Sequence, residues 1–243
     1  MGKSLIQQKR GKGGPTYRAP SFRYVGEVRH PATGEQPVAG KILDIVHCPG
    51  HSGPLAVVEY QNGQVLYMLA SEGMKQGDVI SAGKQAEISI GNTSLLGEMP
   101  EGTLVYNIEA IPGDGGKFAR ASGTFGRIVA KIEDKVVVQL PSKKEKTFDA
   151  KCKAAIGIVA GGERLEKPLL RAGNNFYKMK ARNKLYPRVS GTSMNAVDHP
   201  FGGSSTHHKG KCSTPSRFAP PGAKVGLIRA RQTGRRKGKK VQV

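Results

Sequence analysis

The stretch LAVVEYQNGQVLYMLA (residues 55–70) contains two apolar runs separated by a turn signal. The runs Leu55–Tyr60 and Gln64–Ala70 are rich in β-branched and aromatic side chains, which favour strands. Between them, Asn62-Gly63 is a strong signal for a two-residue hairpin turn, because both residue types tolerate a positive φ. The stretch therefore predicts two antiparallel strands joined as a hairpin.

Three further strands are expected around this hairpin: Val38–Val46, with Gly40 as a bulge, Ala86–Ile90 and Thr103–Ile111. Ser71–Gly77 and Gly91–Gly102 are predicted to be loops, and no convincing long helix is present. Five short strands without such a helix are typical of a small closed barrel. We therefore expect an OB-fold over residues 37–112.

Residues 113–170 repeat this pattern. A hairpin of Gly126–Ile132 and Lys135–Leu140 is expected around Glu133-Asp134, and Thr147–Asp149 and Lys153–Ala160 supply further strands. These elements predict a second small β-barrel of SH3-like size, so the fold class is all-β. The tip of a hairpin at Lys143–Lys146 is either a solvated turn or a phosphate contact.

The amount of apolar material limits how much of the chain can form a core. Only 37% of the 243 residues are hydrophobic, and the chain has 33 Gly and 15 Pro. This composition suits one or two small barrels but not a globule of the full length. Loops and extended segments must therefore be extensive.

Charge is unevenly distributed along the chain, whose net charge is +21. Residues 1–36 contain 7 Lys/Arg and 2 Asp/Glu, residues 37–112 contain 3 and 8, residues 113–170 contain 12 and 7, and residues 171–243 contain 17 and 1. The first segment is predicted to be a basic arm, and the last a basic Gly/Pro-rich extension that cannot fold alone. Nucleic acid is the default partner, with an anionic membrane as the competitor.

Membrane insertion and secretion find no support in the sequence. There is no run of about 18 apolar residues to span a bilayer. Residues 1–10 are charged but lack the apolar region of a signal peptide. The three cysteines, Cys48, Cys152 and Cys212, are odd in number and far apart, which favours a reduced, cytosolic setting.

The stretch RVSGTSMNAVDHPFGG (residues 188–203) has neither helical nor strand periodicity. It places Asn195, Asp198 and His199 in the most basic part of the chain, and Asp198 is the only acid among residues 171–243. This pattern predicts an irregular segment that becomes ordered against a polyanion, with Asp198 and Asn195 fixing the loop. The alternative for Asp198 is a chance residue of a solvated loop.

Catalysis, nucleotide binding and zinc binding are competing interpretations of short motifs. Asp198-His199 could be an orienting carboxylate and a general base, but no defined nucleophile or apolar pocket accompanies them. Gly113–Arg120 lacks the Gly-Lys-Ser/Thr end of a P-loop, so it either contacts RNA phosphate through Lys117 and Arg120 or simply joins the two barrels.

A zinc site would need two distant half-sites. Cys48-x-x-His51 could supply one half, and His207, His208 and Cys212 the other, but no Cys-x-x-Cys pair is present.

In the basic arm, Tyr17, Phe22 and Tyr24 alternate with arginines. These aromatic rings either stack on bases or dock on the protein's own domain.

Met194–Gly203 closely resembles the signature of the large ribosomal subunit protein two (L-two) family. Gly113–Gly123 and Tyr17–Tyr24 are similar to other landmarks of that family, and the similarity covers essentially the whole chain. The length and Phe201 resemble the archaeal and eukaryotic branch, because bacterial members usually have a second histidine at that position. This departure argues against a role that requires two histidines.

The resemblance implies an OB-fold barrel followed by an SH3-like barrel, with termini threaded into large-subunit rRNA. It implies a cytoplasmic ribosomal protein rather than an enzyme. Such a protein is a primary rRNA binder that supports subunit assembly, subunit association and the architecture near the peptidyl transferase centre. The resemblance places His199 close to that centre. Expected partners are this rRNA, other ribosomal proteins and the small subunit at the intersubunit face, without a membrane or a small-molecule substrate. No cofactor is expected, apart from magnesium held through rRNA.

Two rivals remain for the function: a catalytic subunit that uses His199 as a base, and a transient RNA-binding factor that uses its OB-fold. The predicted rRNA-binding residues are mostly cations, together with the signature stretch. They are Lys9, Arg10, Lys12, Arg18, Arg23, Lys117, Arg120, Lys178, Lys180, Arg182, Lys184, Arg188, Met194, Asn195, Asp198, His199, Gly202, Gly203, His207, His208, Lys209, Lys211, Arg217, Arg235, Arg236 and Lys237. Binding through these cations releases counterions and should weaken steeply with salt.

Overall fold

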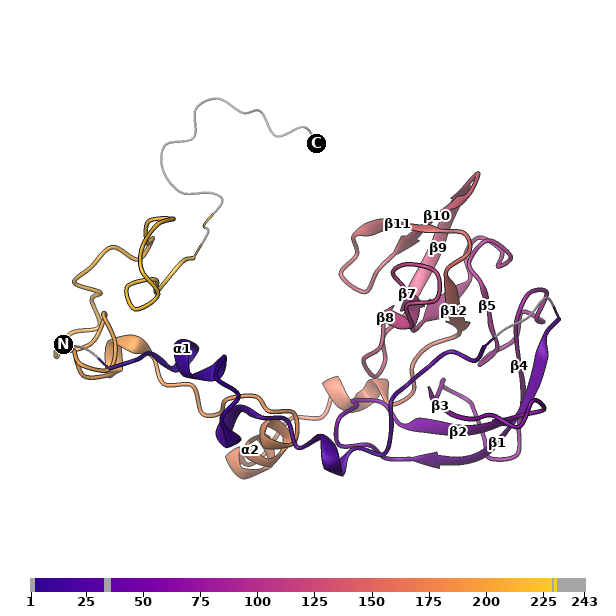
Figure 1. Ribbon diagram of the computed structural model, residues 1–243, viewed down its shortest axis with the longest axis horizontal. Coiled ribbons are helices and arrows are strands. Elements are labelled where there is room, and N and C mark those ends of the chain that lie inside the picture. The colour runs from indigo at the N-terminus through magenta and orange to yellow at the C-terminus, as the bar shows by residue number, and fades with distance from the viewer. Residues whose placement is uncertain (1–2, 33–35, 229, 231–243) are drawn as a thin grey trace. The chain divides into compact units, whose positions relative to one another are not determined.

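The computed structural model describes residues 3–32, 36–228 and 230 (Figure 1). The chain forms two compact units. The first, here called the barrel unit, comprises residues 20–170. The second, here called the extension unit, combines the segment that ends at Ala19 with the chain from Arg171 onwards.

Strands dominate the barrel unit. They are β1 (Val38–Val46), β2 (Leu55–Tyr60), β3 (Val65–Leu69), β4 (Val79–Ala82), β5 (Thr93–Leu95), β6 (Leu104–Tyr106), β7 (Ile108–Glu109), β8 (Gly116–Phe118), β9 (Gly126–Ile132), β10 (Lys135–Gln139), β11 (Glu145–Asp149) and β12 (Lys153–Ile156). Ten of them form one sheet in the order β11-β10-β9-β6-β12-β5-β4-β1-β2-β3, and β7 pairs with β8 (Figure 1). The fold is all-β, an OB-fold barrel followed by an SH3-like barrel, as the sequence predicts.

The strand predictions are confirmed in full for β1, β2 and β9, and β3, β10 and β11 differ only at their ends. The predicted strand Thr103–Ile111 is divided into β6 and β7 because Asn107 between them takes a φ of 51°. The predicted strand Lys153–Ala160 ends early, at Ile156.

The predicted strand Ala86–Ile90 is wrong, because this segment is a loop between β4 and β5, both of which the sequence analysis missed. The Asn92 side chain holds the loop: its Oδ1 accepts from the Ser81 N–H at 2.8 Å, and its Nδ2 donates to the Glu87 carbonyl at 2.9 Å. Ala86 is buried but Ile88 and Ile90 are exposed, so the apolar alternation of the segment does not correspond to one buried face.

The turn of the opening hairpin contains three residues rather than the predicted two. The Tyr60 N–H donates to the Gln64 carbonyl and the Gly63 N–H donates to the Tyr60 carbonyl, both at 2.9 Å. Gly63 takes a φ of 77°, which suits the left-handed position of a three-residue hairpin loop. The hairpin is thus confirmed, with a longer turn.

Gly40 is not a bulge. It pairs in register with Tyr60 and Ile80, and the irregularity of the ladder lies between Ile42 and Asp44. A Cβ on Gly40 would lie 2.7 Å from the Tyr60 ring, so the glycine lets this ring pack on the strand.

Three apolar clusters fill the barrel unit. The first comprises Ile42, Ala56, Val58, Tyr60, Met68, Ala70, Ile80 and Ala82. The second comprises Leu96, Met99, Val105, Ile108, Ile128, Val136, Val138, Phe148, Cys152, Ala154 and Ile156. The third joins strands of both barrels and comprises Val28, Cys48, Leu55, Leu69, Tyr106, Ala155 and Val159.

Packing and strand pairing both cross residue 112, where the sequence predicted a domain boundary. The second cluster already starts at Leu96, and β12 pairs with β5 and β6.

The predicted arm of residues 1–36 is divided between the two units. Residues 3–19, with α1 (Ile6–Arg10) and a 3₁₀ turn at Pro15–Tyr17, belong to the extension unit. From Pro20 onwards the chain belongs to the barrel unit, where Val28 is buried and forms an isolated parallel β-bridge with Tyr67 of β3. Tyr24 and Val28 both pack in the third apolar cluster, which ties this part of the arm to the barrel unit.

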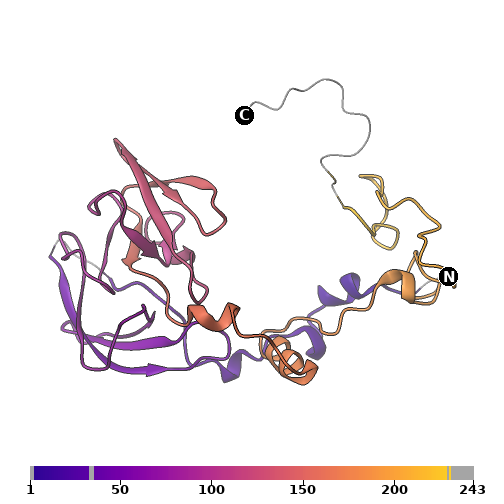
Figure 2. The ribbon, with the colours of Figure 1, turned by 180° about the vertical axis from the view of Figure 1, so that it is seen from behind.

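The extension unit contains one longer helix, α2 (Ala172–Ala181), and a 3₁₀ turn at Gly191–Ser193. In both views the indigo N-terminal segment runs alongside the orange segment around α2 (Figures 1 and 2). The Asn183 side-chain amide donates to the Tyr17 carbonyl, and the Lys3 N–H donates to the Val197 carbonyl at 2.9 Å. In the described part of the chain, every helix is too short or too polar to cross a bilayer.

Candidate nucleic-acid interface

The signature stretch Met194–Gly203 is folded by its own backbone. The Asn195 carbonyl accepts hydrogen bonds from the N–H groups of Asp198 (3.0 Å) and His199 (3.1 Å), and the Gly203 N–H donates to the Met194 carbonyl at 3.1 Å. Gly202 lies against the carbonyls of Met194 and Asn195, which leaves no room for a Cβ. The stretch therefore has a defined, irregular shape that requires glycine at this position.

The imidazole of His199 is held inside this loop. Its Nδ1 accepts a hydrogen bond from the Phe201 N–H at 3.1 Å, so the neutral ring carries its proton on Nε2. Gly191 lies against the ring, and the Phe201 ring centroid is 5.2 Å away. Burial lowers the pKa of His199. At neutral pH the side chain therefore offers an uncharged Nε2–H donor rather than a fixed positive charge.

Asp198 ties the loop to the N-terminal segment. Its carboxylate lies 3.5 Å from Nζ of Lys3, and the Asp198 side chain is 45% exposed, so the ion pair contributes about 0–1 kcal/mol. Because Phe201 occupies Nδ1 of His199, Asp198 does not orient the imidazole through that atom. The geometry therefore lacks the carboxylate–imidazole relay that the catalytic interpretation requires.

Phe201 is a residue whose structural role the sequence analysis missed. Leu5, Phe201 and Val225 are 6%, 8% and 6% exposed and form the buried cluster of the extension unit. This cluster joins the N-terminal segment, the signature stretch and the loop that follows it. A large apolar side chain among glycines and polar residues was the available signal.

Several predicted RNA-binding cations lie on the N-terminal segment. Lys9, Arg10, Lys12 and Arg18 are all exposed, and Lys9 and Arg10 occupy the last turn of α1. Arg23 is also exposed but belongs to the barrel unit, where its guanidinium lies 5.4 Å from the ring of Phe22. The Phe22 ring is 83% exposed, so its stacking face is open.

Helix α2 carries cations at its C-terminal end, where the helix dipole favours them. Lys178 and Lys180 lie in the last turn, and Arg182 is the C-cap residue. Lys184 and Arg188 follow and are exposed. No residue of α2 is buried, so packing within the chain contributes little to the stability of this ten-residue helix.

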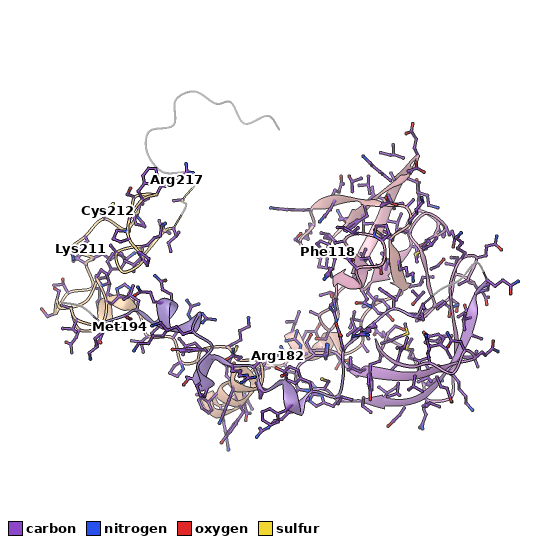
Figure 3. All side chains as sticks on the ribbon, viewed as in Figure 1. Phe118, Arg182, Met194, Lys211, Cys212 and Arg217 are labelled. Carbon is purple, nitrogen blue, oxygen red and sulfur yellow. The ribbon has the colours of Figure 1, made fainter. Side chains whose placement is uncertain are left out.

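Farther along the extension unit, the predicted residues His207, His208, Lys209, Lys211 and Arg217 are exposed. Figure 3 shows Lys211 and Arg217 on the last described part of the chain. Arg235, Arg236 and Lys237 lie outside the described residues.

The two cysteines that the sequence suggested as zinc ligands have hydrogen-bond partners in the structure. His51 Nδ1 lies 3.2 Å from the Cys48 thiol, which is buried, whereas the thiol of Cys212 bonds to the Thr214 carbonyl at 3.3 Å. Within residues 3–32, 36–228 and 230, no three His, Cys, Asp or Glu side chains gather closely enough to hold a metal ion.

The glycine-rich loop Gly113–Arg120 is partly committed to the fold. Gly116–Phe118 forms β8, and the Arg120 guanidinium donates to the Gly116 carbonyl at 2.8 Å. Burial lowers the pKa of Arg120, which is only half-buried. Lys117 is exposed. Of the two predicted phosphate ligands in this loop, Lys117 is thus the more accessible.

The first barrel offers no aromatic platform of the kind that transient OB-fold proteins use to stack bases. Its three aromatic residues are Tyr60, Tyr67 and Tyr106. Tyr60 and Tyr106 are buried, and the Tyr67 ring lies against Gly26. Burial raises the pKa of both Tyr60 and Tyr106 well above its ordinary value.

Comparison with known proteins identifies the family to which the chain belongs. Residues 3–82 match the family model "Ribosomal Proteins L2, RNA binding N-terminal domain", and residues 89–221 match "Ribosomal Proteins L2, C-terminal domain". The chain belongs to the ribosomal protein L2 family. Membership confirms the predicted resemblance and the prediction of a structural ribosomal component rather than an enzyme.

Individual members of the L2 family are similar over almost their whole length. "Large ribosomal subunit protein uL2" of Archaeoglobus fulgidus is 54% identical over 237 residues, which cover 98% of this chain and 100% of the relative. The protein of the same name from Methanococcoides burtonii is 50% identical and covers 97% and 100%. That from Halorubrum lacusprofundi is 50% identical and covers 97% and 98%.

Proposed function

We propose that this chain is a structural, rRNA-binding constituent of the large ribosomal subunit, in which a folded barrel unit anchors a cation-rich extension unit on RNA. The observation that carries the proposal is the lack of internal compensation for the charge. The chain carries 39 Lys/Arg against 18 Asp/Glu, and the ion pairs among the described residues are Lys3–Asp198 and Arg29–Glu27. So many cations are neutralised by an external polyanion, and rRNA supplies phosphates at the required density.

Salt dependence tests this proposal. The affinity of the full chain for large-subunit rRNA should fall by about 10³- to 10⁵-fold between 50 and 200 mM salt if about 6–10 phosphates are contacted. The measurement is the dissociation constant at a series of salt concentrations. A change below about tenfold would contradict binding through phosphates.

The position within the ribosome is the finer part of the proposal. Similarity of Met194–Gly203 to the family signature supports a place near the peptidyl transferase centre of a cytoplasmic ribosome, with roles in subunit assembly and in association with the small subunit. The neutral Nε2–H of His199 would then donate to an RNA acceptor, while RNA itself performs the chemistry.

His199→Ala in reconstituted large subunits separates scaffolding from catalysis. We expect impaired assembly, with peptide-bond formation per assembled particle unchanged. His199→Gln is the matched control, because an amide retains an N–H donor and should preserve more of the assembly. Normal assembly with lost peptide-bond formation would instead favour a catalytic role for His199.

A further inference from the structure

Residues 213–228 form a closed loop in the extension unit. The Leu227 N–H donates to the Ser213 carbonyl at 2.8 Å and joins the two ends of the loop. Within it, the Ala219 N–H donates to the Ser216 carbonyl at 3.1 Å. Val225 anchors the loop in the buried cluster with Leu5 and Phe201. The loop is therefore held in a defined position next to the signature stretch.

Residues of this loop, together with Ala230, line an open cavity of about 630 Å³. Its lining includes Thr214, Pro215, Arg217, Phe218, Lys224 and Ile228. The volume lies within the roughly 300–1,000 Å³ range of small-molecule sites, so a nucleotide fits it by size. The lining combines two cations with an aromatic ring and an aliphatic side chain, which matches the two chemical parts of a nucleotide.

Phe218 supplies the aromatic face. Its side chain is 88% exposed, and the guanidinium of the neighbouring Arg217 lies 5.8 Å from the ring centroid. The backbone beneath it is held by a hydrogen bond from the Phe218 N–H to the Ser216 hydroxyl at 3.3 Å. A large aromatic ring fully open to water is costly in the free protein. A flat apolar partner would recover this cost.

Lys224 and Arg217 supply the charge. Nζ of Lys224 donates to the Arg217 carbonyl at 3.0 Å, which places the ammonium beside the cavity and leaves two further N–H donors on it. The Lys224 carbonyl in turn accepts a hydrogen bond from the Gln7 side chain at 2.9 Å. Figure 3 shows Arg217 on this loop, in the last described part of the chain. Both cations are thus carried by a backbone that the rest of the unit supports.

We propose that this cavity binds one unpaired, unstacked nucleotide of the rRNA, with the base stacked on Phe218 and the phosphate bound by Arg217 and Lys224. The inference rests on the proposed function, because it assumes that RNA is the polyanion. A duplex hides the faces of its bases, so only a bulged, looped or flipped-out nucleotide can present a face to Phe218. The site therefore adds recognition of local RNA structure to the general attraction of phosphates.

The test uses the full chain bound to large-subunit rRNA, with affinity and the chemical reactivity of individual bases as readouts. Phe218→Ala should weaken binding by about 5- to 150-fold and should make one unpaired nucleotide more reactive, because stacking on it is lost. Phe218→Trp should restore both values. Phe22→Ala is the matched control, because Phe22 is similarly exposed and has Arg23 beside it, yet belongs to the barrel unit; it should leave that nucleotide protected.

The outcomes separate this site from the proposed function. If the unmutated chain fails to bind rRNA, both proposals are overturned. If it binds but Phe218→Ala matches it in affinity and in base reactivity, the nucleotide site alone is overturned. Ultraviolet crosslinking of Phe218 to another protein rather than to a nucleotide would also overturn it. Thermal unfolding should be unchanged in Phe218→Ala, since the side chain is exposed.

Discussion

The barrel unit and the extension unit of this chain are stabilised in different ways. The barrel unit buries three apolar clusters that draw on almost every strand. Among the described residues of the extension unit, one buried cluster of three side chains is present, formed by Leu5, Phe201 and Val225. The hydrophobic effect therefore supports the barrel unit without a partner, whereas the extension unit depends on backbone hydrogen bonds, a few contacts and neutralisation of its charge.

The comparison shows how one chain can combine a rigid body with an RNA-shaped surface. Apolar clusters are concentrated in the barrel unit, and the excess of cations over acids lies in the extension unit. Residues 171–243 carry 17 Lys/Arg and one acid, so self-repulsion opposes compaction of this part until RNA is present.

Removal of a core ring should damage the barrel unit severely. Phe148 is buried in the second cluster, and its ring lies 5.2 Å from that of Phe118 in an edge-to-face arrangement. Phe148→Ala should lower the free energy of unfolding of the full chain by about 3–5 kcal/mol. Urea unfolding measures this, with Phe22→Ala as the exposed control. A loss below about 1 kcal/mol would show that this cluster does not hold the unit together.

The same truncation in the extension unit should have a local effect. Phe201→Ala removes the aromatic ring of the three-residue cluster, and burial of that side chain is worth about 1.5–3 kcal/mol. In the chain bound to large-subunit rRNA, backbone amides of residues 194–203 and 213–227 should then exchange faster with solvent, while the unfolding transition of the barrel unit in the free chain is unchanged. Hydrogen exchange read by mass spectrometry measures both. Loss of barrel stability in this variant would contradict the independence of the two units.

The third prediction concerns pH and the barrel unit. Nε2 of His30 lies 2.7 Å from the Asn107 carbonyl and so carries the proton, while its buried Nδ1 has no partner among the described residues. Burial lowers the pKa of His30 below its ordinary value. Below about pH 6.5 the unfolded chain therefore binds a proton that the folded chain resists, so stability is lost as the pH falls towards the folded-state pKa.

His30→Gln tests this linkage, because the amide keeps a donor but cannot titrate in this range. We expect the variant to lose less stability than the unmutated chain between about pH 7 and pH 5. Urea unfolding at several pH values gives the two slopes. Equal slopes would show that His30 is not the group responsible.

Strong local patterns predicted much of the fold. The strands β1, β2 and β9 followed from alternation and turn residues, and the all-β class followed from them. The strand prediction for Ala86–Ile90 failed because its alternation does not reflect burial: Ile88 and Ile90 are exposed, and Ala86 alone is buried. The strands β4 and β5 are too short to show a pattern. Strand pairing crosses the predicted boundary at residue 112, because β12 returns to pair with β5 and β6, a long-range contact that local sequence does not encode.

For the candidate site, composition indicated which residues are exposed cations, but not which segments of the chain meet. Charge counting identified the exposed cations, and the unusual acid Asp198 indicated a specific contact. Its partner, Lys3, lies 195 positions earlier and could not be found from local spacing. Phe201 and the loop around Phe218 were missed, because their roles depend on which segments meet rather than on residue type alone.

The most direct test of the difference between the units is hydrogen exchange of the full chain, free and bound to large-subunit rRNA. We predict that the strands of the barrel unit are protected in both states, whereas α2 and residues 194–203 become strongly protected only in the bound state. Equal protection of the two units in the free chain would contradict the claim that RNA, rather than an internal core, stabilises the extension unit.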